Sequence, residues 1–343
     1  MRDAVETSSP EAFRNALDRL LETLLPSVHG QPWALLDWPG HTNVGDSAIW
    51  LGALAALERR FGRPPAFLSR SAEFPHGLDD AMPEGIVFLL GGGNFGDLWK
   101  SVHESRLRVL QGFRHRRIIQ LPQSIHFQSQ ASLEATRKAV EQHPDFTLLV
   151  RDKASFAFAE TQFSCPALLG PDMAYGLGSL APPAPADTDV FSLLRTDLER
   201  QEGSPERREL ARFGPCEDWT LRRAPGLHRA VDAMVLDLSP RSPALMRLRE
   251  RAYRRYARKE VLRGARLLAR GRLVVTDRLH AHILCHLMGR PHVVLDNSYG
   301  KIFGFIETWP RDGNTFMAKG LKDIEAIIGS RSRPVPASGG MTR

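Results

Sequence analysis

The alternation of short aliphatic runs with helical patterns constrains the fold of this chain most. Each run has the length and apolar content of a strand buried in a parallel sheet. The clearest helical pattern is GDSAIWLGALAALERRFG at 45–62, with charges at its C-terminal end and Gly62 as a stop. Such alternation predicts an α/β protein with doubly wound sheets. The predicted strands of the first half are 33–37, 86–90, 117–121 and 146–150.

A second series of strands follows the stretch GLGSLAPPAPADTD at 176–189, which is rich in Gly, Pro and Ala and lacks apolar periodicity. We interpret this stretch as a linker between two domains, which a chain of 343 residues can accommodate. The second series comprises predicted strands at 190–195, 272–277 and 292–296 and a helical pattern at 228–238. The predicted units are an N-terminal domain at 1–180, a C-terminal domain at 187–330 and a disordered tail at 331–343.

Composition favours an anionic partner without naming one. The chain has 46 Lys plus Arg against 39 Asp plus Glu and a net charge of +7. It contains no zinc finger, RNA-recognition motif or aromatic-basic interleaving, so nucleic acid is not expected as a partner. Three scattered cysteines indicate neither a disulfide framework nor a zinc knuckle. The N-terminus reads as a capped helix rather than a signal peptide, and no apolar run approaches the ~18 residues of a membrane span, so we expect a cytoplasmic protein.

Polar residues follow the predicted strands, and ligands of α/β proteins bind where strands end at their carboxyl edges. In WPGHTNVGDSAIW at 38–50, Asp46 is the expected N-cap of the next helix, and Asn43 and Asp46 are expected to face a cleft between the domains. The alternative for this loop is turn chemistry alone.

Two further loops support a ligand site. LLGGGNFGDLW at 89–99 places three glycines directly after a strand, which lets the backbone approach a ligand or another segment closely. Its spacing is not the dinucleotide pattern G-x-G-x-x-G, so NAD is not inferred. LPQSIHF at 121–127 follows the next strand with Gln123, Ser124 and His126, which can hydrogen-bond a sugar or a phosphate.

The stretch VVTDRLHAHILCHLMGRPHVVLD at 274–296 places a cation at a predicted helix start. Asp277 can cap a helix that begins at Arg278, so the free N–H groups of the first turn would point into the cleft. A cation there costs a few tenths of a kcal/mol, roughly, unless a negative group lies beside it. An anionic substrate is one compensation, and a structural pair with Asp277 or another carboxylate is the alternative.

Seven motifs, in order over about 38–310, resemble the polysaccharide pyruvyl transferase family. They are HTNVGDSAIW, LLGGGNFGDLW, LPQSIHF, VRDKASF, GPDMAY, LLRTD and TDRLH with the following GRPHVVLDNSYGK. The resemblance implies two Rossmann-like domains facing a cleft, as in GT-B glycosyltransferases. It also implies transfer of pyruvate from phosphoenolpyruvate to sugar hydroxyls, as a ketal, in exopolysaccharide or another surface glycan. No metal and no cofactor are expected.

The resemblance also assigns roles to residues of the motifs. Phosphoenolpyruvate carries a carboxylate and a phosphate, which Arg195 and Arg278 would bind, although Arg195 could instead be a surface residue beside Asp197. His280 would be either the general acid or a phosphate clamp, and Asp46 or Asp97 the base. The residues expected to bind substrate are Asn43, Gly92, Gly93, Asn94, Gln123, Ser124, Arg195, Arg278 and Leu279.

The histidines after the helix start do not read as a metal site. Residues two apart do not share a helix face, and His282 and His286 lack the Glu and the third ligand of a zinc protease. We expect both to be packing residues, Cys285 to be a small core residue, and Asp172 to be structural.

The segment RLRERAYRRYARKEVLRGARLLARGR at 247–272 is basic, with interspersed apolar residues. It is either the solvated face of a long helix or a contact for an anionic membrane or a lipid-linked sugar. Enzymes similar to this one often act on lipid-linked intermediates, which adds peripheral association with the inner membrane face as a hypothesis. Two alternative functions remain open: a glycosyltransferase that uses a nucleotide-sugar donor, and a catalytically silent sugar-binding protein of the same fold.

Overall fold

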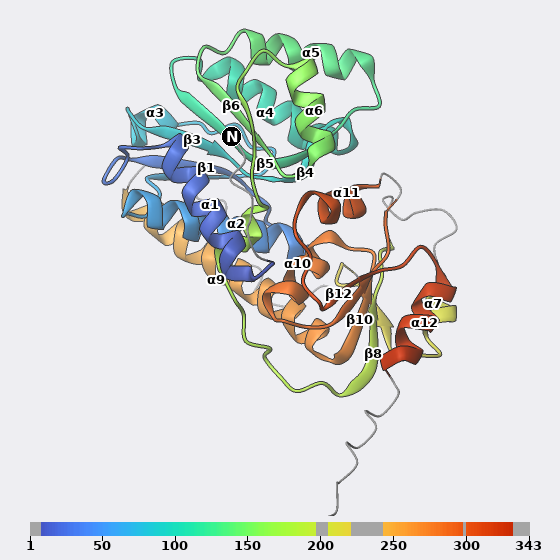
Figure 1. Ribbon diagram of the computed structural model, residues 1–343. Coiled ribbons are helices and arrows are strands. Elements are labelled where there is room, and N and C mark those ends of the chain that lie inside the picture. Colours follow the sequence, from blue (N-terminus) through green and yellow to red (C-terminus); the bar gives the residue numbers. More distant parts are fainter. Residues whose placement is uncertain (1–7, 197–204, 221–242, 298–299, 332–343) are drawn as a thin grey trace, which may run out of the picture.

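The computed structural model describes residues 8–196, 205–220, 243–297 and 300–331. Within them, two β-sheets with helices packed on them make up the molecule (Figure 1), and every strand pair is parallel. The predicted α/β class is therefore confirmed.

The first sheet has the order β2-β1-β3-β5-β6-β7, with β4 paired to β5, and the second has the order β12-β11-β10-β8-β9. The strands of the first sheet are β1 (Trp33–Trp38), β2 (Phe67–Arg70), β3 (Ile86–Leu89), β4 (Gly92–Gly96), β5 (Arg117–His126), β6 (Phe146–Val150) and β7 (Ala167–Leu169). Those of the second are β8 (Thr188–Leu193), β9 (Cys216–Glu217), β10 (Gly271–Thr276), β11 (His292–Val294) and β12 (Thr315–Met317).

Helices connect the strands. With the first sheet are α1 (Pro10–Leu24), α2 (Val44–Phe61), α3 (Leu78–Ala81), the 3₁₀ turn η1 (Asp97–Trp99), α4 (Lys100–Gly112), α5 (Gln130–Glu141), α6 (Lys153–Gln162) and the 3₁₀ turn η2 (Met173–Leu177). With the second are α7 (Arg207–Leu210), α9 (Pro243–Ala269), α10 (Leu279–Leu287), α11 (Lys301–Thr308) and α12 (Leu321–Arg331). No helix of the described ranges is both long enough and apolar enough to cross a membrane.

Two predicted loops lie in strands instead. The strand β5 continues to His126, so Gln123 and Ser124 lie within it rather than after it. The glycine-rich segment forms the edge strand β4. At Gly96 the strand lies so close to β5 that a Cβ atom would be 1.8 Å from the carbonyl oxygen of His126. Gly96 also has a φ of +129°, so only glycine allows this close parallel pairing.

Two of the predicted helix caps, those of α2 and α10, are wrong. The N-cap of α2 is Asn43, whose Oδ1 accepts a hydrogen bond from the N–H of Gly45 at 3.1 Å, while Asp46 lies in the first turn. The N-cap of α10 is Arg278, and its side chain makes no capping bond. Asp277 is turned toward β8 instead, where its Oδ1 accepts the N–H of Arg195 at 2.8 Å.

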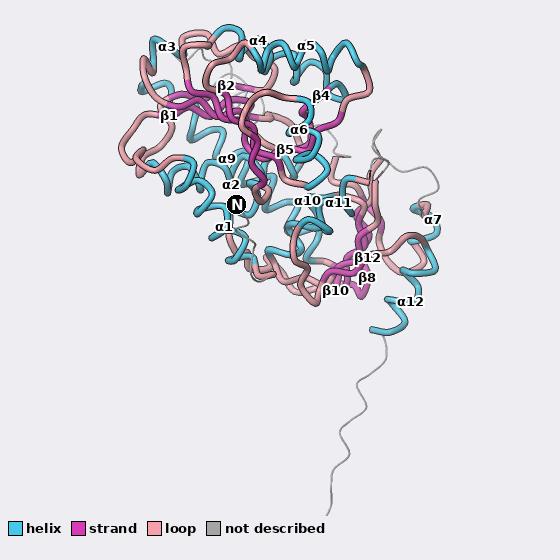
Figure 2. The backbone as a smooth tube through the Cα atoms, turned by 45° about the horizontal axis from the view of Figure 1, so that its top comes forward, coloured by secondary structure: helices cyan, strands magenta, loops and turns pink. Residues whose placement is uncertain are grey.

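The two sheets share part of one hydrophobic core. The predicted linker becomes a connection without helix or strand at 178–187, between η2 and β8. Helix α9 follows in the second half of the chain, yet it packs on α2 and also contacts β2 and β10, so it runs across both units (Figures 1 and 2). One hydrophobic cluster contains buried residues of both sheets. The predicted helix at 228–238 lies outside the described residues, and so does the predicted tail at 331–343 except for Arg331, which ends α12. The domain boundaries stay a prediction.

Candidate active site

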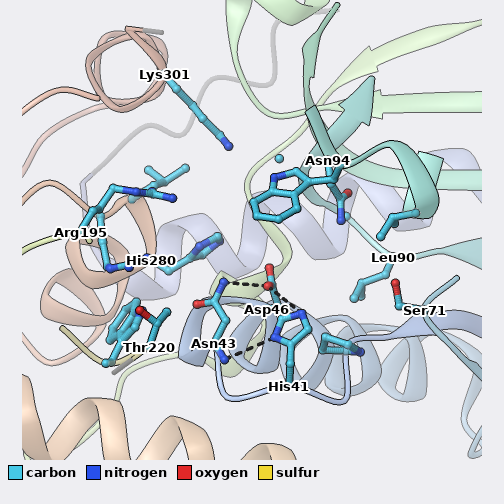
Figure 3. Close-up of a pocket in the computed structure, with 18 of the residues that line it drawn as sticks. His41, Asn43, Asp46, Ser71, Leu90, Asn94, Arg195, Thr220, His280 and Lys301 are labelled. Atoms are coloured by element: carbon cyan, nitrogen blue, oxygen red, sulfur yellow. Dashed lines mark hydrogen bonds and ion pairs between the residues drawn. The ribbon is translucent and has the colours of Figure 1, made fainter. Parts of the chain in front are cut away.

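A cavity of about 370 Å³ lies between the two sheets (Figure 3). Most of its wall follows the carboxyl ends of β1, β2, β3, β6, β8, β9, β10 and β11, as expected for parallel sheets. The residues that line it are Asp37, Pro39, His41, Thr42, Asn43, Asp46, Ser71, Leu90, Gly91, Gly93, Asn94, Trp99, Val102, Arg151, Arg195, Trp219, Thr220, Arg278, Leu279, His280, Asn297, Lys301 and Ile302.

Most of the predicted site residues meet in this cavity. Those that line it are Asn43, Asp46, Gly93, Asn94, Arg195, Arg278, Leu279 and His280. Gly92, Asp97, Gln123 and Ser124 are not among the described lining residues. Gln123 instead holds Asn94, because its Nε2 donates to Asn94 Oδ1 at 2.9 Å and its Oε1 accepts the Asn94 N–H at 3.2 Å.

Asp97 is engaged elsewhere. Its two carboxylate oxygens accept the backbone N–H groups of Gln128 and Ser129 at 2.6 to 3.1 Å. Burial acts to raise the pKa of Asp97, but these backbone hydrogen bonds hold it below its ordinary value. A role as the general base stays a prediction that this geometry does not favour.

Arg151 is a fully buried cation that the sequence analysis did not single out. Its Nη1 donates to Asp172 Oδ2 at 2.5 Å, and its Nε donates to Ser124 Oγ at 2.9 Å. Its Nη2 has no hydrogen-bond partner in the described structure, although the residue lines the cavity. A buried donor without an acceptor costs about 1–3 kcal/mol, so an anionic ligand at this position would be stabilised.

Lys301 is a second cation that the sequence analysis missed. It begins α11, and its side chain points into the cavity in Figure 3. A Cβ atom at Gly93 would lie 1.8 Å from Lys301 Nζ and 3.0 Å from Arg151 Nη2, so this glycine makes room for both cations. Arg151 and Lys301 occur within the motifs VRDKASF and NSYGK, and Arg151 directly follows a strand, which was the available signal.

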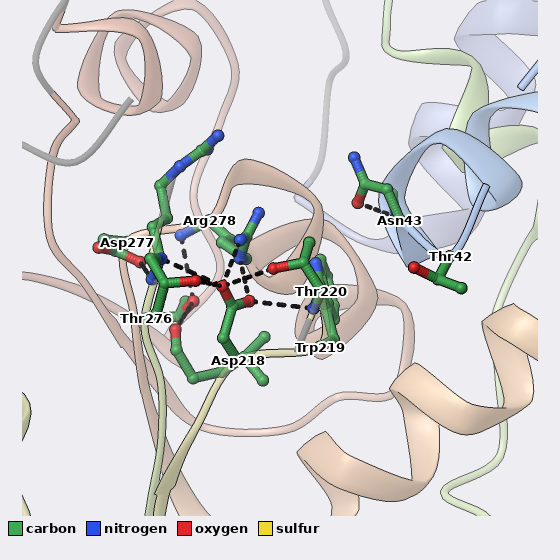
Figure 4. A network of polar contacts seen from close by, with 12 residues as sticks. Thr42, Asn43, Asp218, Trp219, Thr220, Thr276, Asp277 and Arg278 are labelled. Atoms are coloured by element: carbon green, nitrogen blue, oxygen red, sulfur yellow. Dashed lines mark hydrogen bonds and ion pairs between the residues drawn. The ribbon is translucent and has the colours of Figure 1, made fainter. Parts of the chain in front are cut away.

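Arg278 has a carboxylate partner within the protein (Figure 4). Its Nε and Nη2 donate to Asp218 Oδ1 and Oδ2 at 2.9 and 2.8 Å, and both side chains are buried. The hydroxyls of Thr196 and Thr220 also donate to Asp218. Burial acts to raise the pKa of Asp218, but the hydrogen bonds and charge of Arg278 lower it. The pair with another carboxylate, left open by the sequence, is therefore the one that the structure contains.

His280 lies in the first turn of α10, at the junction of the two halves. Its Nε2 is 3.5 Å from Asp172 Oδ2 and 3.5 Å from Arg151 Nη1. Its other ring nitrogen faces α2, where a Cβ atom at Gly45 would lie 2.5 Å from Nδ1. Burial acts to raise the pKa of Asp172, but Arg151 and then the hydrogen bond with His280 hold it well below its ordinary value.

Asp46 is the candidate base that reaches the cavity. Its Oδ2 accepts a hydrogen bond from Asn43 Nδ2 at 2.8 Å and lies 3.5 Å from His41 Nε2. Its side chain is 27% exposed, so a substrate hydroxyl can approach the carboxylate.

The remaining histidines of α10 are packing residues, as expected. His282 Nδ1 lies 2.7 Å from His292 Nε2, and His286 Nδ1 lies 3.0 Å from the hydroxyl of Tyr175. Burial lowers the pKa of His282 well below its ordinary value, and Cys285 beside it is buried as well. Within the described ranges, no three His, Cys, Asp or Glu side chains are grouped as ligands for a metal ion.

Comparison with known proteins identifies the family of this chain. Residues 43–299 match the model of the polysaccharide pyruvyl transferase family. The putative pyruvyl transferase EpsO of Bacillus subtilis is 31% identical over 280 residues, which cover 80% of this chain and 84% of EpsO. Pyruvyl transferase 1 of Schizosaccharomyces pombe is 32% identical over 293 residues, which cover 80% of this chain and 69% of that protein.

A solved structure shares the fold. It is that of a functionally uncharacterized protein from Klebsiella pneumoniae, with a TM-score of 0.60 and 19% sequence identity, and the match covers 89% of this chain and 99% of that one. With the family match over most of the chain and two similar pyruvyl transferases, the chain belongs to the polysaccharide pyruvyl transferase family, and it is a polysaccharide pyruvyl transferase.

Proposed function

We propose that this enzyme transfers pyruvate from phosphoenolpyruvate to two hydroxyls of a sugar and forms a cyclic ketal. We further propose that the two sheets and their common cavity correspond to a GT-B-like arrangement of Rossmann-like domains, with the acceptor on the side of the first sheet. The family membership supports pyruvyl transfer, and the cations of the cavity support the choice of donor.

One observation carries the donor proposal: Arg151 Nη2 is buried at the cavity and lacks an acceptor in the described structure. Lys301 Nζ lies beside it at Gly93, and Arg195 enters from the loop after β8. Phosphoenolpyruvate carries a phosphate and a carboxylate, which are the groups that such cations bind by charge-assisted hydrogen bonds. The Arg278–Asp218 pair adds guanidinium donors with little net charge.

The reaction assigns a task to each side of the cavity. A proton adds to the methylene carbon of the enol phosphate, which becomes a methyl group, and a sugar oxygen bonds to the central carbon. The bond between that carbon and the phosphate oxygen breaks, and a second sugar hydroxyl closes the ketal. In this proposal His280, which lies 3.5 Å from Asp172, supplies the proton, and Asp46, which lines the cavity, accepts a hydroxyl proton.

The acceptor proposal is broader. We propose an exopolysaccharide or another surface glycan, with a lipid-linked oligosaccharide as the substrate. Such a substrate would be met in the cytoplasm, at the inner face of the membrane. We also propose that neither a metal nor a cofactor takes part, so turnover should persist in excess chelator.

Acceptor-dependent phosphate release tests the proposal. Phosphoenolpyruvate is supplied with lipid-linked and nitrophenyl sugars to the wild type, Lys301→Met and His280→Gln. Lys319→Met is the matched control, because this lysine is exposed and lies outside the cavity. We expect the wild type and the control to release phosphate and to be stabilised by phosphoenolpyruvate. Lys301→Met should lose the stabilisation, and His280→Gln should retain it while turnover falls about 10²- to 10⁴-fold.

The alternative functions predict other results. A glycosyltransferase of this fold would be stabilised by a nucleotide-sugar and not by phosphoenolpyruvate. A silent sugar-binding protein would be stabilised by sugars alone and release no phosphate. Either pattern in the wild type would overturn the proposal. Variants of Arg278 are less informative, because the loss of its guanidinium would leave Asp218 buried without this partner.

A further inference from the structure

One exposed surface takes no part in the proposed reaction. It is the outward face of α9, which we call the outer stripe. Its exposed cations and leucines are Leu245, Arg247, Leu248, Arg251, Arg255, Arg258, Lys259, Leu262 and Arg266. They recur every three or four positions and therefore lie along one side of the helix, over roughly 30 Å at 1.5 Å per residue.

The acidic residues of α9 lie on a different face of the helix from the outer stripe. The two acidic residues of the helix are turned inward, where Glu250 pairs with Arg254 and Glu260 pairs with Arg263. The six cations of the outer stripe form no ion pair with the residues that the structure describes. A solvated helix face usually mixes both signs, since opposite charges three or four positions apart stabilise a helix. This face carries positive charge only.

Leucines interrupt the cations on the same face. Leu245, Leu248 and Leu262 are 36%, 45% and 42% exposed. Single exposed leucines are common, but leucines aligned with cations on one helix face are typical of helices that lie in a membrane interface. A nucleic acid would use the cations for its phosphates and gain little from the leucines. The combination therefore favours a phospholipid surface over a polynucleotide.

The opposite side of α9 is hydrogen-bonded to residues that line the cavity. Arg263 Nη2 donates to the carbonyl oxygen of Thr42 at 2.7 Å, and its Nη1 donates to that of Trp219 at 2.9 Å. Both residues line the cavity, one from each half of the molecule. The outer stripe and the cavity are thus attached to the same helix.

We propose that the outer stripe docks the enzyme on anionic phospholipids. Its purpose, delivery of a lipid-linked acceptor to the cavity, rests on the proposed function, whereas the docking itself can be measured without turnover. Cations would meet the lipid phosphates, and the three leucines would enter the boundary between headgroups and acyl chains. Docking through α9 would keep the cavity wall close to the membrane.

Vesicle sedimentation of the full chain tests the docking. Vesicles of phosphatidylcholine, with or without phosphatidylglycerol, are compared at about 50 mM and about 300 mM salt, because screening lengths fall over this range. The stripe variant carries Arg251→Glu, Arg255→Glu and Arg258→Glu. The control carries Lys100→Glu, Arg208→Glu and Arg272→Glu, which changes the net charge equally at side chains that are 77%, 82% and 77% exposed elsewhere. A third variant replaces the three stripe leucines with serine.

We expect the wild type and the control to sediment with vesicles that contain phosphatidylglycerol. With neutral vesicles, both proteins should remain in the supernatant. The stripe variant should bind at least tenfold more weakly, and the serine variant should lose most of the binding that survives at the higher salt. Equal sedimentation of stripe variant and wild type would overturn the proposal. Tighter binding of duplex DNA than of anionic vesicles would instead make the stripe a nucleic-acid surface.

Turnover separates this inference from the proposed function. With phosphoenolpyruvate and a water-soluble sugar, the stripe variant should release phosphate at the wild-type rate, because none of its three changes touches the cavity. Vesicle binding without any phosphate release would support the docking and contradict the proposed donor. Phosphate release without vesicle binding would do the reverse.

Discussion

Two aspartates near the cavity differ in what surrounds them, so we expect their variants to fail in different ways. Asp172 is fully buried against Arg151 and His280, whereas Asp46 is partly exposed to the cavity. Asp172→Asn would leave the Arg151 charge buried without a compensating carboxylate, and it should lower the free energy of unfolding by about 3–5 kcal/mol. Urea unfolding measures this loss.

Asp46→Asn is the matched comparison. An asparagine can still accept the Asn43 hydrogen bond, so stability should stay within about 1 kcal/mol of the wild type. Acceptor-dependent phosphate release should nevertheless fall about 10²- to 10⁴-fold, because the amide cannot take a hydroxyl proton. Full turnover in Asp46→Asn would remove this residue as the base, and wild-type stability in Asp172→Asn would show that Arg151 is compensated by other groups.

Asp277 should give the protein a distinct pH dependence. Burial raises its pKa to about 6 in the folded state, against the hydrogen bond from Arg195 and the charge of Arg278. The folded protein therefore binds a proton at Asp277 more tightly than the unfolded chain does. This proton binding contributes its full stabilisation of the folded state below about pH 4, and the contribution is lost as the pH rises through about 6. Asp277→Asn, which does not titrate, should be more stable than the wild type above pH 6, by at most about 3 kcal/mol.

Thermal unfolding at a series of pH values measures this effect. The stability difference between Asp277→Asn and the wild type should shrink as pH falls from about 6 to about 4, since the wild type then becomes protonated at this position. Asp189→Asn is the control, because Asp189 is exposed at the surface and should follow the wild type throughout. A difference that stays constant from pH 4 to 8 would contradict a raised pKa at Asp277.

At the scale of elements, the sequence predicted strands that are buried on both faces and missed those at the edges. Such strands are runs of mostly aliphatic residues, and the limits of one of them, β6, were predicted to the residue. The missed β2, β7, β9 and β12 are short and lie at sheet edges, where fewer side chains need to be apolar. The edge strand β4 was missed because its glycines are typical of loops.

The contact between α2 and η2 depends on glycine at element scale. A Cβ atom at Gly52 would lie 2.0 Å from the carbonyl oxygen of Met173, so the two backbones pack directly against each other. Gly52→Ala should push them apart and cost about 1–3 kcal/mol, despite the better helix propensity of alanine. The control Gly329→Ala, in α12 with no atom within 4 Å of the new Cβ, should be neutral or stabilising by up to about 1 kcal/mol. Equal stability of the two variants in urea would contradict the close packing.

At the scale of the whole molecule, the sequence could predict which loops line the cavity but not how the charges there are paired. The rule that ligands bind at strand carboxyl ends brought Asn43, Arg195 and His280 into one cavity. The pairing of Arg278 with Asp218 joins residues 60 positions apart, and no local pattern indicates it. The burial of Arg151 likewise depends on how β6 meets its neighbours.

The position of α9 across both sheets predicts that one arginine couples the two walls of the cavity. Arg263 binds the carbonyl oxygens of Thr42 and Trp219, whereas Arg266 lies on the exposed side of the same helix. Arg263→Met should lose these two charge-assisted hydrogen bonds and the ion pair with buried Glu260, and with them about 2–4 kcal/mol of stability. Its stabilisation by phosphoenolpyruvate should also shrink, because the walls that bind the ligand are no longer held together.

Calorimetry with and without phosphoenolpyruvate distinguishes this coupling from a local loss. Arg266→Met removes the same charge from the same helix without touching the cavity, so it should melt like the wild type and keep its full ligand-dependent shift. If Arg263→Met melts earlier but keeps an undiminished shift, Arg263 stabilises the fold without positioning the cavity. If both variants lose the shift equally, the positive charge of α9 acts at long range, and the bonds to the two carbonyls are not what joins the walls.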